Sequence, residues 1–372
     1  MSQSLINEAR ALHQVPKEAA VQYEQLKHIL LEEVNRVFDA HPEKRRLLGP
    51  NSIDLIENNH LNHVNFMSSV FHLNQFELLA RVIPWVYHTY HTKGISYDYF
   101  PIELDAWSHG IKKNLTAPGT EAILGVYEWI RMRHERFISL AETHALIDMP
   151  VPDIAFAELK ERFITALLGA KSAQAIAIAR EAVPSHEHLE AFFMNILQPA
   201  MYDIGQKWER GEISIAQEHL ASSIVGRIMS GLYTTLAKPS VSRGKALVTA
   251  APNEYHELGP WMVSDLLELD GWEITYLGAN TPSDEVVTMM HSLKPFLLAL
   301  SVTMPFNLDR AETIIRAVRA DEGLRSTKIL VGGISFNTVP DLWRQIGADG
   351  HAVNAKDAVS LAKNWWEARA SA

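Results

Sequence analysis

The chain has 372 residues, 47% of them hydrophobic, so it can form two or three domains with sizeable cores. Its formal net charge of -10 argues against direct binding to nucleic acid. The absence of cysteine excludes disulfides, thiolate metal sites and a cofactor attached through a thioether. No signal peptide is recognisable, and no apolar run reaches the roughly 20 residues that span a bilayer, so we expect a cytoplasmic protein without a membrane partner.

Residues 1–150 have the apolar periodicity of an all-helical domain. Thr120 is a candidate N-cap for the last helix, and Met149-Pro150-Val151-Pro152 is the clearest linker in the chain. The expected helices span residues 19–38, 52–72, 74–91, 103–115 and 120–146.

Histidines and aromatic residues are concentrated in this helical domain. His60 and His63 are three residues apart, as are His88 and His91, and residues at this spacing share a helix face. Tyrosines and tryptophans surround the second pair. Three interpretations stay open: a metal site, a pocket for a flat conjugated ligand, and ordinary packing in an association domain. The pattern alone favours packing, because aromatic stripes on helices usually belong to a core.

Residues 153–237 predict a four-helix bundle with short connections. Ser185 is the expected cap of the third helix, and Gly211 follows the end of that helix. Ser214 and Gln217 have the spacing of a capping box for the fourth helix. The expected helices span residues 156–168, 173–182, 186–208 and 215–236.

One spacing in this bundle bears on function. Trp208 ends the third helix, and Glu218 and His219 follow after nine further residues, near the start of the fourth. The two helix ends should meet, so these side chains can converge over one face of a ligand. The alternative interpretation is a core tryptophan beside a solvated Glu–His pair.

Residues 244–370 predict a doubly wound parallel sheet, because strands alternate with helices throughout. Glu254 and His256 lie in the loop after the first strand, at the edge where such sheets bind ligands. Glu254 can orient the imidazole of His256 through one ring nitrogen and leave the other nitrogen for a metal ion. The expected strands span residues 245–250, 273–277, 296–300 and 328–331, with a weaker one near 349–353.

The loop after the first strand also contains a family signature. Its sequence, Glu254-x-His256-x-x-Gly259, resembles the Asp-x-His-x-x-Gly signature of cobalamin-binding domains, with Glu in the place of Asp. A glycine at position 259 lets the backbone pass close to a large flat ligand. The resemblance implies a flavodoxin-like strand order and makes His256 the expected ligand of the cobalt.

Small residues at two other strand ends strengthen this resemblance. Ser301 and Thr303 follow the third strand, where the family has a Ser-x-Leu element, and Gly332-Gly333 ends the fourth, where it has a Gly-Gly pair. The resemblance implies that these residues line a slot for the displaced nucleotide tail of cobalamin.

The spacing in the bundle resembles that of light-sensing, adenosylcobalamin-dependent repressors. This likeness implies that Trp208 packs against the adenosyl group and that Glu218 binds its ribose, with His219 beside them. Those repressors have a histidine directly after the tryptophan, and it takes the cobalt after photolysis. This chain has Glu209 there, so the upper ligand in the light state stays open.

The stretch from Trp85 to Pro101 resembles the amino-terminal region of photocobilins, which pair cobalamin with non-covalently bound biliverdin. A chain without cysteine would have to hold a bilin by packing and hydrogen bonds. Arg81, His88 and His91 are our candidates for polar contacts with the bilin propionates.

The sequence therefore predicts a light sensor rather than an enzyme, in which photolysis of bound adenosylcobalamin rearranges domains or subunits. We expect a light-dependent homo-oligomer with an unidentified output partner. Two alternatives stay open: a corrinoid methyl carrier of a methyltransferase system, and a cobalamin-dependent regulator that acts through a partner protein. A mutase is disfavoured, because 150 helical residues cannot form a barrel of roughly 250 residues. The first domain also shows no basic recognition helix for DNA.

Overall fold

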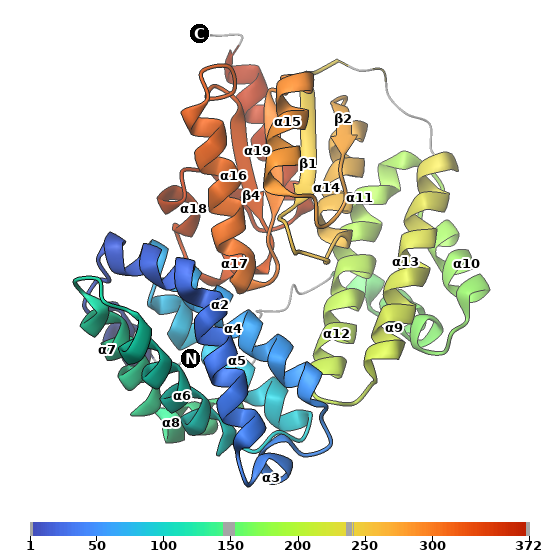
Figure 1. Cartoon of the computed structure of the whole chain (residues 1–372). Coiled ribbons are helices and arrows are strands. Elements are labelled where there is room, and N and C mark those ends of the chain that lie inside the picture. The colour runs from blue at the N-terminus through green and yellow to red at the C-terminus, as the bar shows by residue number, and fades with distance from the viewer. Residues whose placement is uncertain (1–2, 144–152, 236–239, 241, 370–372) are drawn as a thin grey trace. The chain divides into compact units, whose positions relative to one another are not determined.

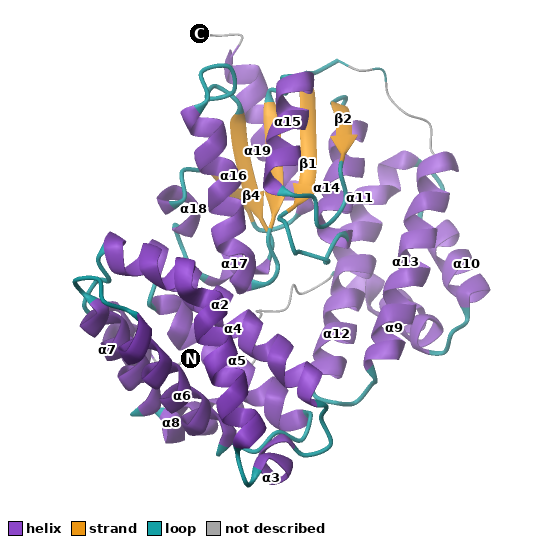
Figure 2. Ribbon diagram, in the orientation of Figure 1, coloured by secondary structure: helices purple, strands orange, loops and turns teal. Residues whose placement is uncertain are grey.

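Helices make up most of the chain, and one parallel sheet lies in its C-terminal third (Figures 1 and 2). This architecture confirms the expected fold class: an all-helical first domain, a four-helix bundle and a flavodoxin-like sheet. No helix among the described residues is long and apolar enough to cross a membrane. The computed structural model describes residues 3–143, 153–235, 240 and 242–369.

The chain divides into two compact units. The N-terminal unit comprises residues 1–147 and 305–309, and the C-terminal unit comprises residues 148–304 and 310–372. The predicted linker Met149-Pro150-Val151-Pro152 lies outside the described residues.

Helices with aromatic inner faces form the N-terminal unit. Ser52 caps α4, because its hydroxyl accepts a hydrogen bond from the amide of Leu55 at 3.3 Å. The helices are α1 (Gln3–Arg10), α2 (Lys17–Ala40), α3 (Lys44–Leu48), α4 (Ile53–Leu73), α5 (Glu77–Thr92), α6 (Tyr99–Asn114), α7 (Thr120–Arg131) and α8 (His134–Ala141), with a 3-10 turn η4 (Pro305–Asn307).

The single helix predicted for residues 120–146 is wrong. The chain instead forms α7 and α8, which are separated by a turn at 132–133, and residues 144–146 lie outside the described part. The turn brings the buried ring of Phe137 to 5.9 Å from that of Trp129 and 5.7 Å from that of Tyr87. Helical periodicity alone therefore does not reveal the turn that this packing accompanies. The N-cap of α7 is Gly119, in a left-handed conformation, and Thr120 is the first helical residue.

The bundle consists of four helical stretches, as predicted. The capping box is confirmed: the amide of Ser214 donates to Oε1 of Gln217 at 2.9 Å, and the amide of Gln217 donates to Oγ of Ser214 at 3.3 Å. Ser185 occupies an N-cap position, although its hydroxyl pairs with the ring of His188. The stretches are η1 (Ile154–Phe156) with α9 (Ala157–Leu168); α10 (Ser172–Ala182); η2 (His186–His188), α11 (Leu189–Phe192), the π-helical turn η3 (Phe193–Leu197) and α12 (Gln198–Glu209); and α13 (Ile215–Thr235).

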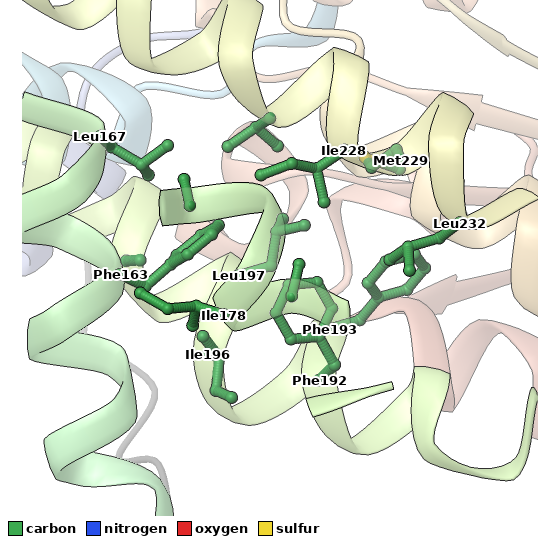
Figure 3. Packing of buried hydrophobic residues seen from close by; sticks show 14 of the residues in the cluster. Phe163, Leu167, Ile178, Phe192, Phe193, Ile196, Leu197, Ile228, Met229 and Leu232 are labelled. Carbon is green, nitrogen blue, oxygen red and sulfur yellow. The ribbon is translucent and has the colours of Figure 1, made fainter. Parts of the chain in front are cut away.

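The bundle and the sheet domain share one hydrophobic core. Phe163, Phe192 and Phe193 fill the centre of the bundle, with Ile228 and Leu232 from α13 beside them (Figure 3). The same core continues into Met262 and Leu266 of α14 (Leu258–Leu269) and Ala355 of α19 (Ala355–Ala368). Apolar burial therefore fixes the bundle against the sheet domain inside the C-terminal unit.

The sheet has the strand order β2-β1-β3-β4-β5, and all its pairs are parallel. This is the flavodoxin-like order that the resemblance implied, in which ligands bind where the order reverses. Helices α14 and α19 pack on one face, and α15 (Ser283–Leu293) and α16 (Leu308–Ala320) cover the other (Figure 1). The remaining elements are β1 (Lys245–Ala250), β2 (Glu273–Tyr276), β3 (Leu297–Ser301), β4 (Lys328–Gly332), α17 (Ile334–Thr338), α18 (Leu342–Gln345) and β5 (Gly350–Ala352).

Gly333 is expected to be essential for the stability of the sheet edge. Its φ is +95°, and a Cβ there would lie 2.3 Å from the carbonyl oxygen of Val302. Gly333→Ala should lower the free energy of unfolding by about 1–3 kcal/mol, measured by urea denaturation of the cofactor-free protein. Gly205→Ala in α12 is the control, since nothing lies within 4 Å of its Cβ position and an interior helical alanine should be neutral or stabilising. Equal urea midpoints for Gly333→Ala and wild type would contradict this account.

Candidate functional site

Glu254 is the centre of the site at the carboxyl end of β1. Its side chain is fully buried. One carboxylate oxygen, Oε1, accepts hydrogen bonds from Nδ1 of His256 at 2.5 Å and from its amide at 3.2 Å. The other oxygen, Oε2, accepts from the amides of Thr303 at 2.9 Å and Met304 at 2.8 Å. The carboxylate thus joins the loop after β1 to the loop after β3.

This hydrogen bonding shifts the pKa of both side chains and sets the tautomer of the neutral imidazole. Burial favours the neutral form of Glu254, but the hydrogen bonds and charge of His256 and the amide of Met304 outweigh burial and lower its pKa. Burial opposes protonation of His256, yet the hydrogen bond and charge of Glu254, together with the charge of Glu218, raise its pKa. Because a carboxylate can only accept, the Nδ1 of His256 carries the proton, and Nε2 of the neutral ring has a free lone pair.

The neighbouring strand ends bring the other predicted residues together. Ser301 pairs in register with Gly332, and the amide of Val302 donates to the carbonyl of Gly332 at 2.9 Å. The carbonyl of Thr303 accepts a hydrogen bond from Oγ of Ser335 at 2.8 Å. Small residues are needed here. A Cβ at Gly332 would lie 3.2 Å from the carbonyl oxygen of Ala352, and a Cβ at Gly333 would lie 2.3 Å from the carbonyl oxygen of Val302.

Gly259 opens the space next to His256. A Cβ at this position in α14 would meet no atom within 4 Å, so the backbone is accessible to a ligand. The side chain of His256 is itself 58% exposed. An accessible imidazole lone pair beside an open backbone surface suits a metal held in a large flat ligand.

The bundle places Glu218 within electrostatic range of His256. Glu218 lies in the first turn of α13. Its side chain is 27% exposed and accepts a hydrogen bond from Oγ of Ser222 at 2.8 Å. His219 is 69% exposed, with Nδ1 at 3.5 Å from Oε2 of Glu218. Trp208 is half-buried near the C-terminal end of α12, which packs against α13. The predicted turn between the two helices is therefore present.

Two polar residues at this site were missed by sequence reasoning. Ser222 lies one helical turn after Glu218, a spacing that could have indicated the hydrogen bond between them. Asn280 follows β2 and has a φ of 56°, a conformation that Asn tolerates better than most residues. The loop after β2 contained no signature residue, so nothing in the sequence drew attention to it.

The three residues predicted to contact a bilin have different partners within the N-terminal unit. The guanidinium of Arg81 pairs with Glu77, its Nε donating to Oε1 at 2.7 Å. Nδ1 of His88 lies 2.9 Å from the carbonyl of Ala141. His91 is exposed and stacks on Tyr97, with ring centroids 4.0 Å apart. Each side chain thus has a contact within the helical unit.

The interior of the N-terminal unit holds a polar cluster around Glu103. Its Oε1 accepts from Nε1 of Trp107 at 3.0 Å and lies 3.2 Å from Nδ1 of His63. Nε2 of His63 lies 3.2 Å from the hydroxyl of Tyr127, which is 2.8 Å from the hydroxyl of Tyr23. Burial raises the pKa of Glu103 to about 7 and lowers that of His63 to about 3. Among the described residues, no group of three or more His, Asp or Glu side chains could hold a metal ion.

Comparisons with protein families identify the C-terminal unit. Residues 244–360 match a family model described as a B12 binding domain, and residues 159–233 match a second model with the same description. The chain carries two B12-binding domains. The bundle and the sheet domain each correspond to one of them, whereas the helices of residues 3–143 lie outside both matches.

Individual relatives fall into two groups. Monomethylamine corrinoid protein 2 of Methanosarcina acetivorans is 26% identical over 213 residues, which are 56% of this chain and 97% of that protein. The HTH-type transcriptional repressor CarH of Myxococcus xanthus is 29% identical over 143 residues, which are 38% of this chain and 46% of the repressor. The structure of the Methanosarcina barkeri monomethylamine corrinoid protein matches the fold with a TM-score of 0.50 and 24% identity, over 56% of this chain and 99% of that one.

The residues at the sheet edge fit a cobalamin. The free lone pair of His256 provides a nitrogen ligand of the kind that transition metals prefer. Gly259 leaves room for a flat macrocycle, whereas Gly332 and Gly333 let the backbone at the strand ends pack closely against the carbonyls of Ala352 and Val302. Glu254 would hold the imidazole in the tautomer that binds metal through Nε2.

Glu254→Gln should reveal the ion pair through the pH dependence of stability. Because the pKa of His256 is raised on folding, the ion pair stabilises the folded protein fully at pH values below about 6.5, the pKa in the unfolded chain. This stabilisation is lost as the pH rises through the pKa of the folded state. Because the pKa of Glu254 is lowered on folding, its carboxylate stabilises the folded protein fully at pH values above about 4.5, the pKa in the unfolded chain. This stabilisation is lost as the pH falls through the pKa of the folded state. The loss of unfolding free energy in Glu254→Gln should therefore be larger at pH 5.5 than at pH 8.5, by on the order of 0.5 kcal/mol for this partly exposed ring.

Urea denaturation of the cofactor-free protein at the two pH values measures this difference. His256→Ala is the control background, in which the part of this pH dependence that comes from the charge of His256 should be lost. An equal effect of Glu254→Gln at both pH values in the His256 protein would contradict the charged pair.

Proposed function

We propose that this protein is a light sensor that binds adenosylcobalamin, with His256 as the lower cobalt ligand and the bundle over the upper face. Bound adenosylcobalamin would supply a cobalt–carbon bond that green light breaks. His256 would hold the metal through Nε2, and Glu254 would hold the imidazole. Trp208 and Glu218 would contact the adenosyl group. Signalling by this route requires no catalytic residue, so we propose a sensor rather than an enzyme.

The position of the Glu218 carboxylate supports this proposal. Glu218 is mostly buried, is held by Ser222, and acts electrostatically on His256. A carboxylate accepts hydrogen bonds, which the ribose hydroxyls of an adenosyl group can donate and a methyl ligand cannot. A polar acceptor at this place favours an adenosyl ligand over the methyl ligand of a carrier protein.

The output is proposed to be a light-dependent change in the arrangement of subunits or domains that a partner protein reads. CarH is by name an HTH-type repressor, and the match covers 46% of its length. This chain has a formal net charge of -10, which opposes contact with phosphates. We therefore propose a homo-oligomer that signals through a protein partner instead of through DNA.

Spectroscopy of the reconstituted protein tests the proposed function. Wild-type protein loaded with adenosylcobalamin in the dark should show a lasting change in its absorption spectrum after green light. Trp208→Ala should lose about tenfold in its preference for adenosylcobalamin over methylcobalamin, because the ring no longer covers the adenosyl group. Trp343→Ala, in α18, is the matched control and should keep the preference.

The methyl-carrier function makes the opposite prediction. A carrier would prefer methylcobalamin and would transfer its methyl group to a thiol in the presence of a partner methyltransferase. If the wild-type protein prefers methylcobalamin and transfers its methyl group in this way, the protein is a methyl carrier and the proposed sensor function is wrong.

A second chromophore in the N-terminal unit is a further candidate function, and we propose non-covalent biliverdin. Supporting it are polar atoms buried among aromatic rings: Nε2 of His60 and the hydroxyl of Tyr99 have no hydrogen-bond partner among the described residues. Leaving such a group unsatisfied costs roughly 1–3 kcal/mol, so a ligand with polar atoms would stabilise this interior. Arg81, His88 and His91 remain our candidates for its propionates.

Titration with biliverdin tests the second chromophore. Full-length protein should give a red-shifted, structured absorption band, and His88→Ala should weaken binding by about tenfold, because an imidazole partner of a propionate is lost. His109→Ala, an exposed histidine of α6, is the matched control and should bind as wild type does. A free-pigment spectrum with the wild-type protein would leave the N-terminal unit as an association domain.

A further inference from the structure

Asn280 holds three consecutive residues of the loop that carries His256. Its amide N–H donates to the carbonyl of Glu254 at 3.1 Å. Its Oδ1 accepts from the amide of Asn253 at 2.8 Å, and its Nδ2 donates to the hydroxyl of Tyr255 at 3.3 Å. Asn280 thus holds the main chain at Asn253 and Glu254 and the side chain of Tyr255, directly before His256.

The strand order explains why this contact matters. In the order β2-β1-β3, the loop after β1 lies between the loops after β2 and β3. On the β3 side, the Glu254 carboxylate binds the amides of Thr303 and Met304. On the β2 side, Asn280 binds the loop backbone. The loop is therefore attached to both of its neighbours, once through its side chain and once through its main chain.

We propose that Asn280 is a positioning residue for His256, so that losing its side chain weakens cobalt binding without removing a ligand. The inference rests on the proposed ligation of cobalt by His256. A side chain that binds a metal has to be held within about 0.5 Å of its productive position. The exposed ring of His256 has few contacts of its own that could hold it there. His256 is 58% exposed, so the backbone on its N-terminal side and the Glu254 carboxylate provide the constraint.

Asparagine is the residue that meets all the requirements of this position. Its φ of 56° is in the left-handed region, which Gly and Asn adopt at lowest cost. Glycine would keep the backbone conformation but has neither the acceptor for Asn253 nor the donor for Tyr255. Aspartate would keep the acceptor and lose the donor.

These differences define the test. Asn280→Gly removes the side-chain hydrogen bonds without backbone strain, Asn280→Asp restores the acceptor, and Tyr255→Phe removes one bond from the other side. Lys294→Gly is the matched control: Lys294 is also left-handed, with a φ of 48°, but it ends α15 before β3, at the opposite edge of the sheet.

The full-length protein is measured with and without adenosylcobalamin. Asn280→Gly should bind adenosylcobalamin about tenfold more weakly and shift its dark spectrum from the His-ligated toward the base-off form. In the cofactor-free protein, the amides of Thr303 and Met304 should exchange hydrogen about tenfold faster, because the loop bearing Glu254 is less constrained. Asn280→Asp should recover most of both properties, Tyr255→Phe should show a smaller loss, and Lys294→Gly should match wild type.

Failure of this inference and failure of the proposed function give different results. Wild-type affinity, spectrum and amide exchange in Asn280→Gly would overturn the positioning role while leaving cobalamin binding intact. Equal losses in Lys294→Gly would also overturn it, because the effect would then be one of general stability. Absence of cobalamin binding by wild type would refute the proposed function, and the exchange rates would still report whether Asn280 holds the loop.

Discussion

The buried Glu254 carboxylate is the interaction on which the site depends. Its two oxygens accept four N–H groups, from the ring and amide of His256 and from the amides of Thr303 and Met304. A buried carboxylate without such partners would be costly, so these contacts both permit its burial and determine where the loops after β1 and β3 lie. The tautomer of His256, and with it the direction of its free lone pair, follows from the same contacts.

A shared apolar core joins the bundle to the sheet domain in the C-terminal unit. The phenylalanine-rich core of the bundle extends into α14 and α19, the two helices that cover one face of the sheet. This shared core sets the helix end that carries Glu218 within electrostatic range of His256. Apolar burial thus positions the polar acceptor on which the choice of an adenosyl ligand would depend.

Much of the fold was predictable, because its signals are local. The alternation of strands and helices predicted all five strands, and the Ser214–Gln217 capping box was visible as a spacing. The break between α7 and α8 was not predictable from helical periodicity, which continues across the turn that lets the ring of Phe137 pack near Trp129 and Tyr87. The contacts of Asn280 and Ser222 depend on strand order and helix geometry, so the sequence pointed to His256 and Glu254 but not to the residues that hold the loop and the cap.

Ligation of cobalt by His256 is the central claim, and electron paramagnetic resonance tests it most directly. The full-length protein is loaded with cobalamin, reduced to the Co(II) state, and compared in unlabelled form and with histidine uniformly labelled with nitrogen-15. If Nε2 of His256 binds the metal, the nitrogen splitting of the cobalt signal changes from a triplet pattern to a doublet pattern on labelling. A splitting that stays the same after histidine labelling would contradict the account.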